Sequence, residues 1–182
     1  MGDDTYGFNL RFSRRYSMAH RLMSGAAPNC GIPHGHDEVV TADIVEDANR
    51  GLDPETNMLV EFDQVKRRWF KWIDGAVDHS FQIGDEDPLI AYFQNNEPLL
   101  VARLLVTPGD PTTEMRAALY SAKLSAFLSA DNPDFCCCQL TIQETPTNSV
   151  VFYPAAIKGV VPQGNLHWWN RPDQSINDLS AN

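Results

Sequence analysis

The order in which extended and helical patterns follow one another constrains the fold of this chain most strongly. Extended patterns cover residues 7–19 and 39–45, and an amphipathic helical pattern follows at residues 63–73. A second helical pattern, with Pro111 at its start, covers residues 112–128. The remaining strands are predicted on either side of this second helix, at residues 99–107, 135–143 and 150–153. This order predicts an α+β fold with helices on one face of a mainly antiparallel sheet.

Composition and charge exclude several classes of protein. The net charge of −10 argues against a nucleic-acid surface, which needs clustered Lys and Arg side chains. No stretch approaches the roughly 18 consecutive apolar residues of a membrane span. Residues 1–4 lack the basic and then apolar order of a signal peptide. We therefore expect a cytoplasmic protein with one core and without a nucleic-acid or membrane partner.

Two further features are interpreted as structural. Adjacent strand residues point to opposite faces, so Cys136–Cys138 cannot share one tetrahedral metal cage without distortion. We expect these cysteines to be small buried strand residues, and we expect no disulfide framework. The tail from Lys158 onward, with Trp168 and Trp169, is expected to pack on the surface or fray.

Three histidines form a candidate metal site. His34 and His36 lie two residues apart in an extended segment, so both imidazoles point to the same face. Gly35 between them removes bulk where a ligand could approach. His20 adds a third imidazole from the preceding strand. Three histidines without a fourth strong ligand are typical of catalytic zinc, which keeps an open position for water or substrate.

Other polar residues suggest chemistry beside such a metal. Cys30 is either the fourth ligand of a closed structural site or a nucleophile or base beside an open one, and its spacing does not separate these roles. Asp78 next to His79 is a carboxylate–imidazole pair suited to acid–base work, provided that it lies near the metal. Glu144 precedes a predicted turn, and a carboxylate there can accept two parallel N–H bonds from the guanidine-like edge of a heterocycle.

These residues belong to motifs that occur in one order along the chain. YSMAHRL at residues 16–22 precedes C-x3-HGH at 30–36 and LDPET at 52–56. The motifs that follow are LVEF at 59–62, Val65-Lys66, Asp78-His79, PTTE at 111–114, Glu144-Thr145 and Tyr153. In this order and spacing, the chain from about residue 8 to residue 154 closely resembles the 6-pyruvoyl-tetrahydropterin synthase superfamily.

The resemblance implies the T-fold, an α+β arrangement of a four-stranded antiparallel sheet with two helices on one face. Members of the superfamily assemble through their sheets into β-barrels, commonly as homohexamers built from two trimers, with active sites between subunits. The T-fold domain is then expected at residues 1–157, and residues 158–182 form a C-terminal extension.

The resemblance also implies roles for individual residues. Cys30 matches the catalytic base, and Asp78 with His79 matches the relay that handles a second proton. Glu144 matches the carboxylate that anchors the pterin, and it is also counted in the relay. The residues that match the Zn²⁺ ligands are His20, His34 and His36. The residues that match the helix start lining the pterin pocket are Thr112, Thr113 and Glu114.

The implied substrate is 7,8-dihydroneopterin triphosphate. One chemistry on this scaffold eliminates triphosphate and gives 6-pyruvoyl-tetrahydropterin. The other also breaks a side-chain carbon–carbon bond and gives 6-carboxy-tetrahydropterin and acetaldehyde, a step toward 7-deazaguanines such as queuosine. The carboxy-forming enzymes resemble C-x3-HGH, so the spacing from Cys30 to His34 favours a 6-carboxy-tetrahydropterin synthase. The alternatives are the pyruvoyl-forming reaction and a non-catalytic T-fold protein that binds zinc or a pterin.

The sequence departs from the family pattern at several positions. Asp37 and Glu38 stand where a small polar residue and an aromatic residue are usual. Two such carboxylates near the metal are expected to raise local pKa values or to repel a triphosphate. Residues 85–110 form a longer segment than in compact bacterial members. None of these departures replaces a metal or catalytic position.

Overall fold

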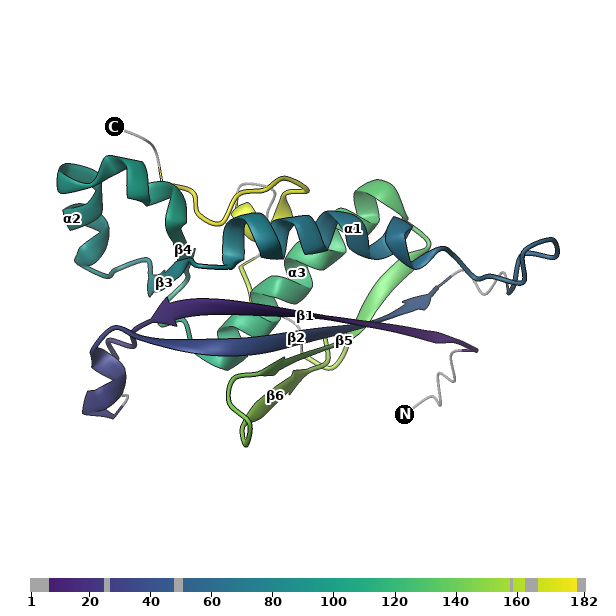
Figure 1. Cartoon of the computed structure of the whole chain (residues 1–182), viewed down its shortest axis with the longest axis horizontal. Helices are drawn as coiled ribbons and strands as arrows, with labels where there is room; N and C mark the ends of the chain where they lie inside the picture. The colour runs from purple at the N-terminus through teal and green to yellow at the C-terminus, as the bar shows by residue number, and fades with distance from the viewer. Residues whose placement is uncertain (1–6, 25–26, 48–50, 158, 163–166, 180–182) are drawn as a thin grey trace.

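The structure is a computed structural model and describes residues 7–24, 27–47, 51–157, 159–162 and 167–179. Its centre is a six-stranded sheet with the order β4-β3-β1-β2-β5-β6 (Figure 1). Four of these strands, β1, β2, β5 and β6, are antiparallel neighbours, in agreement with the predicted mainly antiparallel sheet. Their bounds are β1 Asn9–His20, β2 His34–Glu46, β5 Phe135–Gln143 and β6 Ser149–Phe152.

The expected four-stranded antiparallel sheet is wrong in its strand number and in part of its direction. Strand β3, Phe81–Gly84, pairs in parallel with the end of β1, and β4, Leu104–Thr107, pairs in parallel with β3. Parallel neighbours need a crossover connection, which the segment between β3 and β4 supplies. That segment holds helix α2, Leu89–Asn96, and the 3₁₀ helix Pro98–Arg103. The strand predicted at residues 99–107 therefore exists only from Leu104 onward.

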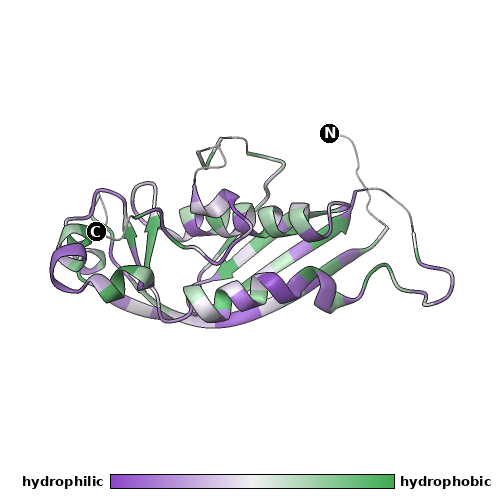
Figure 2. Ribbon diagram, turned by 90° about the horizontal axis from the view of Figure 1, so that it is seen from above, coloured by the Kyte–Doolittle hydropathy of each residue, from purple (hydrophilic) through white to green (hydrophobic). Residues whose placement is uncertain are grey.

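The two predicted helices are confirmed and lie on one face of the sheet. Helix α1, Phe62–Trp72, and helix α3, Thr113–Asp131, run across that face (Figure 1), and the view from above shows both over the strands (Figure 2). Thr112 caps α3, because its side chain accepts a hydrogen bond from the Met115 N–H at 3.2 Å. None of the helices in the described part of the chain combines the length and apolarity that a membrane span needs.

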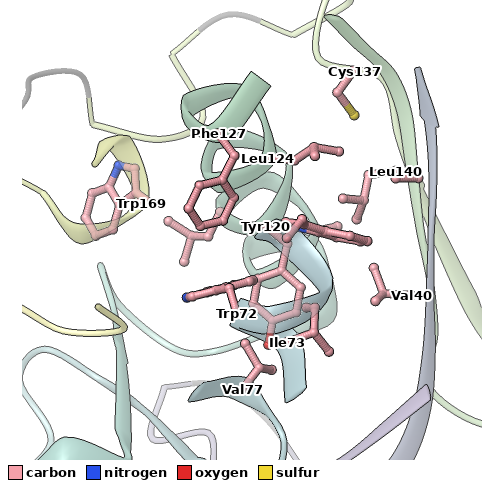
Figure 3. Close-up of a cluster of buried hydrophobic side chains, with 14 of the residues drawn as sticks. Val40, Trp72, Ile73, Val77, Tyr120, Leu124, Phe127, Cys137, Leu140 and Trp169 are labelled. Carbon is pink, nitrogen blue, oxygen red and sulfur yellow. The ribbon is translucent and has the colours of Figure 1, made fainter. Parts of the chain in front are cut away.

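The core between the helices and the sheet contains many aromatic side chains. Trp72 and Tyr120 are fully buried between α1 and α3, with their rings in edge-to-face contact at 5.2 Å (Figure 3). Trp168 and Trp169 from the C-terminal tail are buried in the same cluster. Trp168 stacks on Trp72 at 6.0 Å, and its indole N–H donates to the Val106 carbonyl at 2.8 Å. The tail is thus part of the core at these positions, and it neither frays nor packs only at the surface there.

A buried lysine holds the tail in place. The Lys123 ammonium, on α3, donates to the backbone carbonyls of Trp168 and Arg171, each at 2.8 Å, and contacts Asp173 at 3.1 Å. Burial lowers the Lys123 pKa to about 8, although Asp173 acts in the opposite direction. All three donors of the ammonium are used, so helix α3 and the tail are tied together by charge-assisted hydrogen bonds.

The cysteine triplet lies on β5, as expected for strand residues. Cys137 points into the core, and Cys136 and Cys138 are half-buried. All three thiols are free, and burial raises the pKa of each. High thiol pKa values disfavour the reactive thiolate, which fits a packing role.

Replacing Trp168 with alanine tests the place of the tail in the core. We expect Trp168→Ala to lower the free energy of unfolding by about 3–5 kcal/mol, because it leaves a cavity beside Trp72. Chemical denaturation followed by circular dichroism measures this change. Leu99→Ala is a matched control, since the Leu99 side chain is 91% exposed and its loss should cost little. Equal stabilities of the two variants would contradict the buried tail.

Candidate metal centre and pocket

The pairing of β1 with β2 brings the three predicted histidines together. His20 is the last residue of β1 and His34 the first of β2, and the two are direct cross-strand partners. His36 lies two residues further along β2, on the same face of the sheet. One ligand atom from each histidine lies within 4.8 Å of those from the other two. The structure therefore gathers these three side chains into one candidate metal site.

Hydrogen bonds orient two of the rings for a cation. The Nδ1 atoms of His20 and His34 face backbone carbonyls, those of Pro111 at 3.3 Å and Ile32 at 2.9 Å. Each Nδ1 then carries the proton, and each Nε2 offers a lone pair. The two Nε2 atoms lie 3.0 Å apart, where facing lone pairs repel unless a cation or proton lies between them.

The ligand set fits zinc. A Zn²⁺ ion binds histidine nitrogen at about 2.0–2.1 Å, so one ion can bridge atoms 3.0 Å apart. Burial, and then the positive charge of Arg116, lower the pKa of His20 to about 4. His20 is therefore neutral near pH 7, the state in which imidazole binds metal.

Gly35 lies where the backbones of β1 and β2 approach closely, which the sequence alone does not show. A Cβ atom at position 35 would lie 2.8 Å from the backbone oxygen of Met18 on the neighbouring strand. Gly35 is paired with Ala19, directly beside the pair of His20 and His34. The glycine thus permits close approach of the two strand backbones, rather than clearing space for a ligand.

An open pocket of about 500 Å³ lies beside the histidines. It contains eight of the ten predicted site residues: His20, Cys30, His34, His36, Thr112, Thr113, Glu114 and Glu144. Five further lining residues were missed by sequence reasoning: Leu22, Thr145, Asn148, Ser149 and Val150. Four of these five lie in or beside the turn between β5 and β6, where the Glu144-Thr145 motif was the sequence signal and a site role was predicted for Glu144 alone.

Cys30 reaches the pocket from the loop between β1 and β2. It lies in a short 3₁₀ helix, Pro28–Gly31, and is half-buried. Its carbonyl accepts a hydrogen bond from the Leu22 N–H at 2.8 Å, which closes the loop against the end of β1. Cys30 lines the same pocket as the three histidines.

Glu144, directly after β5, lines the pocket and is held in place by two neighbours on α3. Its Oε1 accepts a hydrogen bond from the Thr113 hydroxyl at 2.6 Å and contacts the Arg116 guanidinium at 3.3 Å. Burial acts to raise the pKa of Glu144, but the Thr113 hydrogen bond and the positive charge of Arg116 outweigh it and leave the pKa below its usual value. The side chain is therefore an anion with fixed orientation.

The expectation that Asp37 and Glu38 repel an anion beside the metal is wrong, because neither residue lines the pocket. Their expected effect on local pKa values is present, since Asp37 raises the pKa of its partner Arg15 and Glu38 adds to the rise that burial causes in the Tyr16 pKa. Asp37 points to the opposite face of the sheet and pairs with Arg15 at 2.8 Å. Glu38 is fully buried and accepts hydrogen bonds from Arg116 at 2.6 Å and from the Tyr16 hydroxyl at 2.5 Å. Neither group is thus placed to repel an anionic ligand directly.

Asp78 and His79 do not line the pocket of their own chain. They lie just before β3, where Asp78 accepts a hydrogen bond from the Ser17 N–H at 2.8 Å. The imidazole of His79 bonds the Asp78 carboxylate at 2.8 Å, and 77% of its side chain is exposed. Burial acts to raise the pKa of Asp78, but the Ser17 and His79 hydrogen bonds outweigh it. The predicted pair is formed and presented outward, beyond the other edge of β1.

The sheet, the two long helices and the histidine-lined pocket define a candidate metal-binding α+β protein, and comparison with known proteins identifies its family. The family model described as 6-pyruvoyl tetrahydropterin synthase matches residues 9–155. The chain therefore belongs to the 6-pyruvoyl tetrahydropterin synthase family, whose members are lyase-type enzymes acting on small pterins.

Individual relatives agree with this family. The 6-carboxy-5,6,7,8-tetrahydropterin synthase of Bacillus subtilis is 28% identical over 149 residues, which are 82% of this chain and 87% of the relative. A solved structure of an uncharacterized protein from Wolinella succinogenes has a TM-score of 0.64 at 20% identity, and covers 80% of this chain and 97% of its own. The 6-pyruvoyl tetrahydropterin synthase of Caenorhabditis elegans has a TM-score of 0.54 at 23% identity, with coverage of 81% and 95%. These two structures share the fold.

Replacing Gly35 with alanine tests the geometry of the candidate metal centre. We expect Gly35→Ala to push β1 and β2 apart and to weaken Zn²⁺ binding by roughly 10-fold or more, as does loss of groups that orient ligands. Competition with a chromophoric chelator measures the affinity. Gly75→Ala is the control, because a Cβ at Gly75 meets nothing within 4 Å. An unchanged zinc affinity in Gly35→Ala would show that the close approach does not set the site.

Proposed function

We propose that this chain is a zinc-dependent 6-carboxy-tetrahydropterin synthase, which converts 7,8-dihydroneopterin triphosphate and one water into 6-carboxy-tetrahydropterin, acetaldehyde and triphosphate. The observation that carries the proposal is the C-x3-HGH spacing, with Cys30 and the three histidines around one pocket. The name of the Bacillus subtilis relative supports the same reaction. In this proposal the enzyme works in the cytoplasm and its product feeds the synthesis of 7-deazaguanines such as queuosine.

The pocket has groups for two parts of such a substrate, the side-chain hydroxyls and the pterin ring. His20, His34 and His36 would hold Zn²⁺, which when bound supplies a Lewis acid for the side-chain hydroxyls. Glu144 would accept the 2-amino and ring N–H groups of the pterin as two parallel hydrogen bonds. Thr113 keeps that carboxylate in place, and the fixed orientation supplies the positioning that the reaction needs. Thr112 and Glu114, at the start of α3, would line the pterin subsite.

Two groups would move protons. The Cys30 side chain would take a proton from the substrate, and His79, oriented by Asp78, would exchange a second one. Because Asp78 and His79 lie outside the pocket of their own chain, we propose that they serve the pocket of a second copy. A homohexamer built from two trimers, as the family resemblance implies, provides such a neighbour.

Product analysis tests the proposed reaction. We expect zinc-loaded protein incubated with 7,8-dihydroneopterin triphosphate to release 6-carboxy-tetrahydropterin and acetaldehyde, detected by mass spectrometry. Cys30→Ala should lower the rate by roughly 100-fold or more, because it removes the proposed base. The same variant should still bind zinc, since three histidines remain.

Two other outcomes would change the assignment. Release of 6-pyruvoyl-tetrahydropterin would make this chain a pyruvoyl-forming enzyme of the same family. Absence of turnover with zinc bound would favour a non-catalytic protein that binds zinc or a pterin. Full activity of Cys30→Ala would contradict the role of the thiol in either reaction.

Mixing two inactive variants tests whether the site is shared between copies. Cys30→Ala and His79→Ala should each be inactive alone. After joint refolding, random assembly should restore activity at about one quarter of the sites, where an intact thiol meets an intact imidazole from a neighbour. Activity is measured by the release of acetaldehyde.

The control is a refolded mixture of Cys30→Ala with a double variant that carries both changes. This mixture has no intact thiol and should stay inactive. If the mixture of the two single variants also stays inactive while zinc and oligomer content are normal, then the thiol and the imidazole do not meet across copies.

A further inference from the structure

A buried arginine joins two carboxylates beneath the pocket. The Arg116 side chain, on α3, is fully buried, and so is Glu38 on β2. One guanidinium nitrogen, Nη1, donates to Glu38 at 2.6 Å, and the other, Nη2, contacts Glu144 at 3.3 Å and Thr113 at 2.9 Å. The fork of one side chain therefore connects the sheet to the wall of the pocket.

The contacts of Arg116 control the orientation of Glu144. Within the described residues, the bonds from Arg116 and Thr113 both reach Oε1 of Glu144. The Glu144 side chain is 23% exposed, and the residue lines the pocket, so it is held from the protein side while it borders the pocket. A carboxylate that accepts two parallel N–H bonds has to keep its plane fixed, and a charged fork behind it provides that restraint.

Glu38 in turn holds Arg116. The Glu38 carboxylate neutralises the buried guanidinium and is itself fixed by the Tyr16 hydroxyl at 2.5 Å. A chain of contacts thus runs from Tyr16 through Glu38 and Arg116 to Glu144. These contacts explain why the second residue after the HGH motif, Glu38, is acidic: its carboxylate neutralises the buried Arg116 guanidinium.

The network is not arranged for greatest stability. Oε1 of Glu38 and Nε of Arg116 are buried without a hydrogen-bond partner in the described part of the chain. Unsatisfied buried polar atoms are costly, and a pair of apolar side chains of similar size is often as stable as a buried ion pair. A costly ion pair with one end on a pocket carboxylate points to a role beyond packing.

We propose that Arg116, held by Glu38, is a positioning residue that fixes the Glu144 carboxylate for the N–H edge of a heterocyclic ligand. This inference rests on the proposed function, in which Glu144 binds a pterin. Arg116 does not line the pocket, so it acts through Glu144 and not on the ligand.

Binding of neopterin, a fluorescent pterin without the triphosphate, tests the inference apart from turnover. The zinc-loaded full chain is titrated, and the unfolding free energy of each variant is measured in parallel. The decisive variant combines Glu38→Phe with Arg116→Leu, which removes both buried charges together. We expect the free energy of unfolding of the double variant to equal or exceed that of either single variant, because no unpaired charge is left buried. We expect its Kd for neopterin to rise roughly 10- to 100-fold, the loss of a hydrogen bond to a charged group.

Three controls separate positioning from general damage. Glu144→Gln should raise the Kd directly. Arg67→Leu removes an exposed arginine of α1 that contacts Asp63 at 3.4 Å and does not line the pocket, and its Kd should stay within about 2-fold of the wild-type value. Arg116→Lys keeps the charge but offers a single ammonium in place of the fork, and its Kd should also rise. The lysine variant decides the question if the double variant does not fold.

The outcomes distinguish this inference from the proposed function. If Glu144→Gln weakens neopterin binding but the folded double variant or Arg116→Lys binds like wild type, the positioning role is overturned and the proposed function stands. If wild type does not bind neopterin, or Glu144→Gln binds unchanged, the pterin-anchoring role of Glu144 fails and the inference fails with it. Weaker binding in stable Arg116 variants supports the positioning role.

Discussion

The antiparallel register of β1 and β2 is the constraint on which the candidate site depends. It sets His20 opposite His34 and Tyr16 opposite Glu38, all on the helix-covered face of the sheet. A slip of one residue would send these side chains to the other face. The metal centre and the network beneath it therefore share one structural origin. Gly35 permits the close approach of the two backbones in this register, because a Cβ at this position would clash with the backbone oxygen of Met18.

Much of the site could be predicted from the sequence because its signals are local. The period-two spacing of His34 and His36 needs only an extended strand to bring both rings to one face. Pro111 and the Thr112 cap mark the start of α3, which places Thr113 and Glu114 at the pocket. The long strands β1, β2 and β5 are likewise marked by local extended patterns.

Other parts depend on contacts that no local pattern records. Strands β3 and β4 are four residues each, and periodicity gives little signal over so short a stretch. Strand β3 pairs in parallel with β1, and β4 with β3, only after long connections along the chain. Arg116 lies in helix α3, which is buried on nearly all sides. The apolar pattern of this helix therefore does not predict that Arg116 pairs with a carboxylate on β2. The sequence could place Asp78 next to His79, but their distance from the pocket appears only in three dimensions.

The buried ion pair of Glu38 and Arg116 also bears on how such a chain can change over generations. Replacing only one of the two residues would leave the other as an unpaired charge in the interior. Stepwise substitution of the ion pair by an apolar pair therefore passes through a less stable single variant. Such an intermediate can stay folded if other parts of the structure contribute enough to the free energy of unfolding. The packing of the tail, with Trp168 in the core, is one such contribution. Two positions 78 residues apart in the sequence are thereby expected to evolve as a unit.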